Sequence, residues 1–194
     1  MFRNGSDKMN LFYEELPSSV TVGGKEIKII TDFREYIRLI DLLKTDEITD
    51  SQKWPFIIQY FREIPNDMQE ALDRLVEFIN LDPIYNIGEN SNDEEYEEKP
   101  LYSFQYDYPY ILSGFLSAYG INLNSIDYMH WWEFRLLFDG LPDETEIKKR
   151  IMYRGIDAGM IKDSEEKKRI IRIQNSIRLP ENEMNDYDIG NAFA

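Results

Sequence analysis

The sequence predicts a mainly α-helical protein of about six to seven helices in two lobes, with a small N-terminal β-hairpin. Apolar residues recur at helical spacing through most of the chain, and several of these stretches follow a capping-box pair. A single stretch near the N-terminus alternates apolar and polar residues, as a half-buried strand does. An acidic segment without apolar periodicity, residues 86–99, separates the two helical stretches. These observations predict the fold class.

The same features predict the domain organisation. We expect a flexible N-terminus over residues 1–16, a β-hairpin plus helical lobe over 17–83, an acidic linker over 84–100, a second helical lobe over 101–180, and a flexible acidic tail over 181–194.

The first lobe begins with the hairpin. Val20 and Val22 alternate with polar residues before Gly23-Gly24, and Ile27 and Ile29 do so after it. Glycine readily takes the positive φ of a tight turn, so the pair predicts the hairpin turn. Capping spacing then places the start of a first helix at Asp32, running to about Leu43, and the start of a third at Asn66, ending before Pro83. Between them, Pro55 suits the first turn of a short second helix.

The second lobe is predicted to hold four helices. Pro109 suits the first turn of a helix that ends at Gly120, and a further helix is expected to begin near Asn124 and carry an aromatic stripe. Two capping pairs, Asp143 with Glu146 and Asp163 with Glu166, begin the last two helices. Pro180 is expected to end the last helix.

Composition restricts the class of protein. The chain has 194 residues, 37 acidic and 22 basic, and a net charge of -15. A surface this negative is repelled by phosphate backbones and anionic lipid, so we expect neither nucleic-acid nor membrane binding. The chain has no cysteine, which excludes thiol nucleophiles and Cys-ligated metals. With no long apolar run, a cytoplasmic protein is expected.

Catalytic patterns are missing from the sequence. One histidine, His130, supplies the only imidazole, and no nucleophile elbow or phosphate-binding glycine loop occurs. We therefore expect no enzymatic activity and no cofactor. A metal-dependent enzyme built on His130, Glu133 and Asp107 is the least favoured hypothesis. We instead expect His130 to donate to a carbonyl or carboxylate at the edge of the core.

With catalysis, nucleic-acid binding and membrane binding disfavoured, we expect the protein to act through protein-protein contacts. Tyrosines crowd residues 102–110, and residues 148–178 carry ten basic and four acidic side chains, a local excess of +6 that leaves -21 on the rest of the chain. Opposite charges on one chain favour self-association or a charged partner, and helical spacing places most aromatics in a core. The candidate contact residues are Trp131, Trp132, Phe134, Tyr106, Tyr110, Lys148, Lys149, Arg150, Lys168, Arg169, Arg172, Ile189 and Phe193.

An ordered string of motifs in the second lobe carries a family resemblance. It comprises Tyr102-Ser103-Phe104 with Asp107, then Phe115, Tyr119-Gly120-Ile121-Asn122-Leu123, His130-Trp131-Trp132-Glu133-Phe134, Gly140-Leu141-Pro142 and Arg154, and Thr31-Asp32-Phe33-Arg34 in the first lobe also fits. Over roughly residues 20–179 the chain resembles the bacteriophage Gp15 family of siphophages that infect Gram-positive hosts.

This resemblance implies a function. By this resemblance, the gene would lie between the genes for the major tail protein and the tape measure protein. Genes in that position resemble those that encode tail assembly chaperones. The resemblance therefore implies a protein of the host cytoplasm that binds and solubilises the tape measure protein during tail assembly and is absent from the mature virion. Opposite charges on one chain add the expectation of a homo-oligomer. The alternative, based on charge, is an acidic DNA mimic that inhibits a host nuclease or defence protein.

Overall fold

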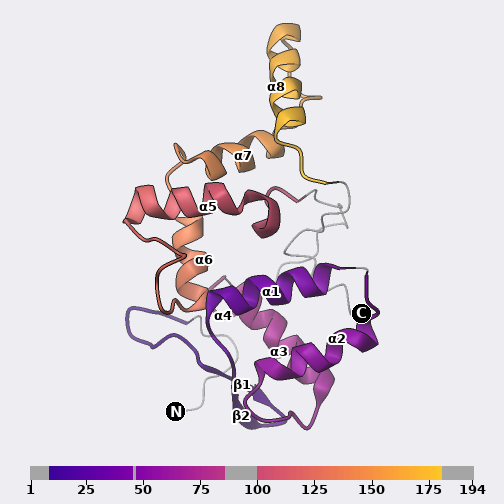
Figure 1. Cartoon of the computed structure of the whole chain (residues 1–194), viewed down its shortest axis with the longest axis vertical. Coiled ribbons are helices and arrows are strands. Elements are labelled where there is room, and N and C mark those ends of the chain that lie inside the picture. The colour runs from indigo at the N-terminus through magenta and orange to yellow at the C-terminus, as the bar shows by residue number, and fades with distance from the viewer. Residues whose placement is uncertain (1–8, 46, 86–99, 181–194) are drawn as a thin grey trace. The chain divides into compact units, whose positions relative to one another are not determined.

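The computed structural model describes residues 9–45, 47–85 and 100–180. It confirms a mainly α-helical fold with an N-terminal β-hairpin (Figure 1). The elements are β1 (Ser19–Val22), β2 (Lys25–Lys28), α1 (Phe33–Lys44), α2 (Asp50–Ile57), the 3-10 helix η1 (Ile58–Tyr60), α3 (Met68–Asn80), α4 (Asp82–Tyr85), α5 (Phe104–Tyr119), α6 (Trp131–Asp139), α7 (Glu146–Gly155) and α8 (Ser164–Ser176).

These elements form two compact units. The described part of the first unit consists of residues 9–45, 47–85 and 128–134, and that of the second consists of residues 100–127 and 135–180. Residues 128–134 thus belong with the N-terminal elements, although the sequence analysis assigns them to the second lobe. Helix α6 begins in the first unit and continues into the second.

The hairpin of the first unit forms as predicted. Strands β1 and β2 are antiparallel, with Val20 opposite Ile27 and Val22 opposite Lys25. Gly23 and Gly24 both have positive φ, at 58° and 74°, as the tight turn requires. The Gly23 amide donates to the Glu70 carboxylate of α3 at 2.8 Å, so the turn is attached to that helix.

The core of the first unit lies between α1 and α3. Tyr36, Leu39 and Ile40 of α1 are fully buried, as are Leu75 and Ala71 of α3. Their spacing follows one face of each helix, so burial of this face explains why these two amphipathic helices form.

Residues 128–134 complete that core. The Phe33 amide donates to the Met129 carbonyl at 3.0 Å, and the Trp131 amide donates to the Thr31 carbonyl at 2.7 Å. The two indole nitrogens of Trp131 and Trp132 donate to carbonyls near the end of α3, at 3.0 and 2.8 Å. Because these bonds satisfy the polar atoms of two fully buried indoles, the segment is an integral part of the unit.

Several helix boundaries differ from prediction. Pro55 and Pro109 are the sixth residues of α2 and α5 and do not lie in their first turns. Helix α2 instead starts after a capping box at Thr49, and α5 starts after Ser103. Both helices tolerate a proline in their second turn, and neither proline marks the start of its helix.

Three further starts also need correction. The cap of α3 is Asp67, whose carboxylate accepts from the Glu70 amide at 3.0 Å, and not Asn66. Helix α7 follows Thr145, which makes no side-chain cap bond, so the Asp143 pair does not cap it. The helix expected near Asn124 begins at Trp131, because the residues just before it pair with residues 31–33. The predicted caps at Asp32 and Asp163 are confirmed.

The second unit is built on α5 and α7, which run antiparallel. Asp107, Tyr110 and Gly114 of α5 lie against Arg154, Arg150 and Ile147 of α7, respectively. Helix α8 follows α7 and is attached to it through Gln174, whose side chain donates to the Tyr153 carbonyl at 2.9 Å. Ile170 of α8 is buried.

Candidate interaction surface

Helix α5 is the longest helix of the second unit and is fixed at both ends. The Ser103 hydroxyl accepts from the Tyr106 amide at 3.4 Å at its start. Gly120, with φ 68°, ends it and donates to the Leu116 carbonyl at 3.1 Å. Its inward side buries Phe104, Ile111 and Phe115. The outward side is therefore held in a defined orientation.

That outward side carries no charge. Its exposed residues are Gln105, Tyr106, Tyr108, Pro109, Ser113, Leu116 and Ser117, and we call this set the α5 face. Tyr106, Tyr108 and Leu116 expose between 49% and 59% of their surface. The only charged residue in the helix is Asp107, which is buried.

The α5 face differs from the outer sides of the other long helices. Each of these exposes at least one charged side chain: Arg38 on α1, Asp50 on α2, Asp73 on α3, Glu133 on α6, Lys149 on α7 and Lys168 on α8. In a chain with 30% charged residues, a helix of 16 residues with no exposed charge is unusual. Depletion of charge and enrichment in tyrosine characterise the centres of protein interfaces.

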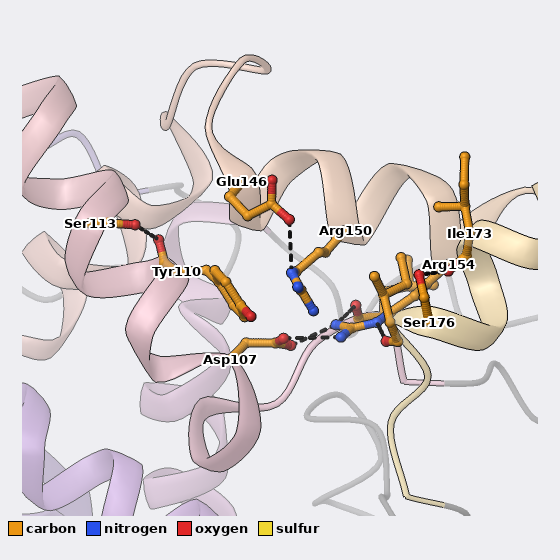
Figure 2. A network of polar contacts seen from close by, with 10 residues as sticks. Asp107, Tyr110, Ser113, Glu146, Arg150, Arg154, Ile173 and Ser176 are labelled. Atoms are coloured by element: carbon orange, nitrogen blue, oxygen red, sulfur yellow. Dashed lines mark hydrogen bonds and ion pairs between the residues drawn. The ribbon is translucent and has the colours of Figure 1, made fainter.

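A buried ion pair positions α5 on α7 (Figure 2). The Arg154 guanidinium donates twice to the Asp107 carboxylate, at 2.6 and 2.9 Å, and the side chains are 8% and 1% exposed. The Ser103 amide donates to the same carboxylate at 3.1 Å. This bidentate arrangement fixes both distance and angle between the two side chains.

Arg154 also joins the rest of the second unit. Its Nε donates to the Ile177 carbonyl, just after α8, at 2.8 Å, and Nη1 donates to the Leu101 carbonyl at 2.9 Å. One guanidinium therefore connects the segment before α5, helix α5 itself and the end of α8. The sequence analysis did not pair Asp107 with Arg154. The sequence feature that could have predicted the pair is a lone carboxylate in an apolar helix, because a buried carboxylate needs a charged partner.

Next to this pair, Tyr110 lies under a second arginine. The Arg150 guanidinium carbon is 3.7 Å from the centre of the Tyr110 ring, and its Nε donates to the Glu146 carboxylate at 3.1 Å. Tyr110 is consequently half-buried, and Arg150 is partly covered. Of the tyrosines predicted to contact a partner, Tyr106 lies on the α5 face and Tyr110 lies at the packed α5–α7 contact.

The other aromatic candidates are in the interior. Trp131, Trp132 and Phe134 are almost fully buried in the first unit, and the Phe134 ring stacks on Phe33 at 4.7 Å between centroids. Helical spacing indicates a core position for such residues. In the structure they build the unit that folds around residues 128–134 and present no surface to a partner.

The basic candidates lie on α7 and α8. Lys148 donates to the Asp139 carbonyl at 2.7 Å, and Lys168 and Arg169 pair with Glu165 and Glu166 one turn earlier. The exposed side chains of Lys149 and Arg172 have no hydrogen-bond or ion-pair partner among the described residues. Ile189 and Phe193 lie outside the described residues.

His130 has a structural role. Its Nε2 donates to the Pro17 carbonyl at 2.9 Å, which confirms the predicted hydrogen bond. Nδ1 accepts from the Trp132 amide at 3.0 Å and so caps the start of α6. Burial lowers the pKa of His130 below 6.5, although the Pro17 hydrogen bond and the Glu133 charge oppose this shift. The neutral ring, with its proton on Nε2, satisfies both bonds.

Two of the three residues in the metal hypothesis, His130 and Asp107, have other partners. Both nitrogens of His130 bind backbone groups, and the Asp107 carboxylate binds Arg154. Among residues 9–45, 47–85 and 100–180, no group of three or more His, Asp or Glu side chains is placed to hold a metal ion.

Within the described ranges, no helix is both long and apolar enough to cross a bilayer. The family model described as "Bacteriophage Gp15 protein" matches residues 12–179. Comparisons with curated proteins and with solved structures found no match.

Proposed function

The chain belongs to the bacteriophage Gp15 family, and this membership indicates a role in phage structure or morphogenesis. On this premise we propose that the chain is a tail assembly chaperone. In this proposal it binds the tape measure protein of the same phage during tail assembly and keeps it soluble. It acts by contact alone, as a protein of the host cytoplasm that does not remain in the mature virion.

The observation that carries the proposal is the uncharged α5 face. A chaperone for a long helical client needs an apolar surface that remains exposed on its own folded state. Tyr106, Tyr108 and Leu116 supply this surface on one side of one helix. An amphipathic helix of the client can lay its apolar side along α5, as two helices pack through their apolar side chains.

The Asp107–Arg154 pair supports this role because it orders α5 before the client arrives. A surface that is already in its binding conformation loses little conformational entropy on binding. The tyrosines add large contact area with few rotatable bonds, and their hydroxyls can face water at the edge of the contact.

Net charge supports the second half of the role. A client coated by copies that each carry a charge of -15 is surrounded by like charges. Like charges keep such complexes apart and oppose aggregation. Binding through an uncharged face leaves this charge exposed to solvent.

Co-expression tests the proposal. The tape measure protein is produced in bacteria with and without the chain, and its soluble fraction and co-elution on size-exclusion chromatography are measured. We expect the client to become soluble and to co-elute with the chain. An insoluble client and no complex would contradict the proposal, and inhibition of a host nuclease would then be measured.

A pair of variants tests the surface. Tyr106→Lys with Leu116→Lys places two charges on the α5 face and should reduce the recovered complex at least about tenfold. The matched control, Thr21→Lys with Gln69→Lys, adds the same charge at exposed positions of the first unit and should leave it unchanged. Equal losses in both would show that charge alone, and not the α5 face, governs binding.

A further inference from the structure

A turn near the N-terminus presents two aromatic side chains to solvent. Phe12 and Tyr13 are 94% and 87% exposed, the largest exposures of any large apolar side chain in the described residues. Apolar residues usually reach the surface singly and with part of their area covered. Two adjacent, almost uncovered rings therefore form an apolar projection of the kind that serves as an interface anchor.

This projection is ordered by hydrogen bonds. The Asn10 side chain accepts from the Phe12 amide at 3.0 Å, and its carbonyl accepts from the amides of Tyr13 and Glu14 at 3.0 and 3.1 Å. The Glu14 carboxylate accepts from the Asn10 amide at 3.1 Å. Residues 10–14 thus hold their shape without help from the two rings. We call residues 10–15 the aromatic turn, and its only charged residues are acidic, Glu14 and Glu15.

Helix α8 presents a surface of complementary chemistry. Lys168, Ile171, Arg172 and Asn175 are exposed at spacings of three and four residues, so they lie on one side of the helix, which we call the α8 stripe. Ile171 is 39% exposed between two basic residues. The opposite side holds the helix to its own unit, because buried Ile170 and the Gln174 bonds to the Tyr153 and Ile156 carbonyls lie there.

We propose that the aromatic turn of one copy docks on the α8 stripe of a second copy. The aromatic turn combines exposed rings with the exposed Glu15, and the α8 stripe combines Ile171 with basic side chains, so the two surfaces are complementary in charge and in apolar character. Glu15 is exposed, and Arg172 has no polar partner among the described residues, so the contact supplies each with an opposite charge. The aromatic rings cover Ile171 and can stack on the Arg172 guanidinium.

This inference goes beyond the proposed function, because it concerns contact between copies and leaves the α5 face free. The contact is heterologous, since one copy gives the turn and the other gives the stripe. Each copy in a pair retains one unused turn or stripe, so association continues to larger species until a ring closes.

Two variants of the full chain test this geometry. The turn variant is Phe12→Ser with Tyr13→Ser, and the stripe variant is Lys168→Glu with Arg172→Glu. All four residues are exposed, and circular dichroism checks that both variants fold. Sedimentation velocity over a range of concentrations should show growing species for the unchanged chain and at least about tenfold weaker self-association for each variant.

Mixing the two variants gives the decisive measurement. The stripe variant retains its turn and the turn variant retains its stripe, so the mixture should form a one-to-one pair that grows no further. Because the contact pairs opposite charges, this pair should dissociate as salt is raised. A monomeric unchanged chain at all concentrations, or a mixture that forms no pair, would overturn the proposal.

A control separates this contact from general stickiness. Tyr106→Ser with Tyr108→Ser removes two exposed rings from the α5 face and should leave self-association unchanged. If this control abolishes association while the turn variant does not, copies associate through α5 and the inference is wrong. The turn variant should still co-elute with the tape measure protein, so failure of self-association and failure of the chaperone proposal can be told apart.

Discussion

Removal of Arg154 should destabilise the second unit more than any surface change. Its guanidinium makes two bonds to Asp107 and one each to the carbonyls of Leu101 and Ile177. Arg154→Met keeps the length of the side chain but leaves the Asp107 carboxylate, which is 1% exposed, without its counterion. Loss of one partner of a buried pair destabilises by about 3–5 kcal/mol. A typical domain is stable by only about 5–15 kcal/mol, so this change is large.

Two further variants assign that loss to the ion pair. Arg154→Lys keeps the charge but cannot form the bidentate contact or reach both carbonyls, so we expect an intermediate loss of about 1–3 kcal/mol. Asp107→Leu with Arg154→Met removes both charges together. It should recover most of the loss in Arg154→Met, because no unpaired charge then remains buried. The carbonyls of Leu101 and Ile177 lose the Arg154 guanidinium as a donor in the double variant, so its stability does not recover fully.

Hydrogen exchange of the α5 amides, followed along a urea titration, reports on this unit alone. The first unit should keep its protection in every variant, because Asp107 and Arg154 belong to the second unit. A loss below about 1 kcal/mol in Arg154→Met would refute the reasoning, because it would place the carboxylate in water. Asp107→Leu is also measured alone, and a double variant whose loss equals the sum of the losses in Asp107→Leu and Arg154→Met would refute the reasoning as well.

Three other predictions concern the first unit. Burial and the Glu77 charge raise the pKa of Asp82 to about 6. The protonated carboxyl group therefore contributes to folding stability at low pH, and this contribution is lost as pH rises from 3.8 through about 6. Asp82→Asn should therefore stabilise the chain by about 1 kcal/mol at pH 7.5, with a gain in urea denaturation that shrinks toward pH 4. The pKa of His130 is lowered, so stability should fall as pH drops below 6.5, and His130→Asn, which can still cap α6, should flatten this dependence in thermal denaturation. A fragment of residues 9–85 should lack a cooperative unfolding transition, because residues 128–134 supply the buried indoles of its core, and a fragment that unfolds cooperatively would show this segment to be dispensable.

The sequence by itself determined the local structure. The hairpin follows from the Gly23-Gly24 turn and its flanking alternation, and the caps at Asp32 and Asp163 follow from side chains that accept from nearby amides. These features depend on residues within a few positions of one another, so pattern reasoning reaches them. The motif string likewise indicated the family.

Prolines show where local reasoning failed. Pro55 and Pro109 fit a first turn by preference, yet the two helices start directly after Thr49 and Ser103, which lie six residues before the prolines. A capping residue and a buried apolar face together outweigh the preference of a single residue, because proline in the second turn removes one hydrogen bond while the rest of the helix still packs.

Tertiary structure alone decided the candidate surface and its support. Asp107 and Arg154 are 47 residues apart, and Trp131 reaches Ile79 across 52, so no local pattern pairs them. The tyrosines of residues 102–110 look alike in sequence, but packing against α7 half-buries Tyr110 under Arg150 and leaves Tyr106 and Tyr108 exposed. Which side of a helix with a single charged residue faces water depends on the elements packed against it, because the hydrophobic effect is non-directional.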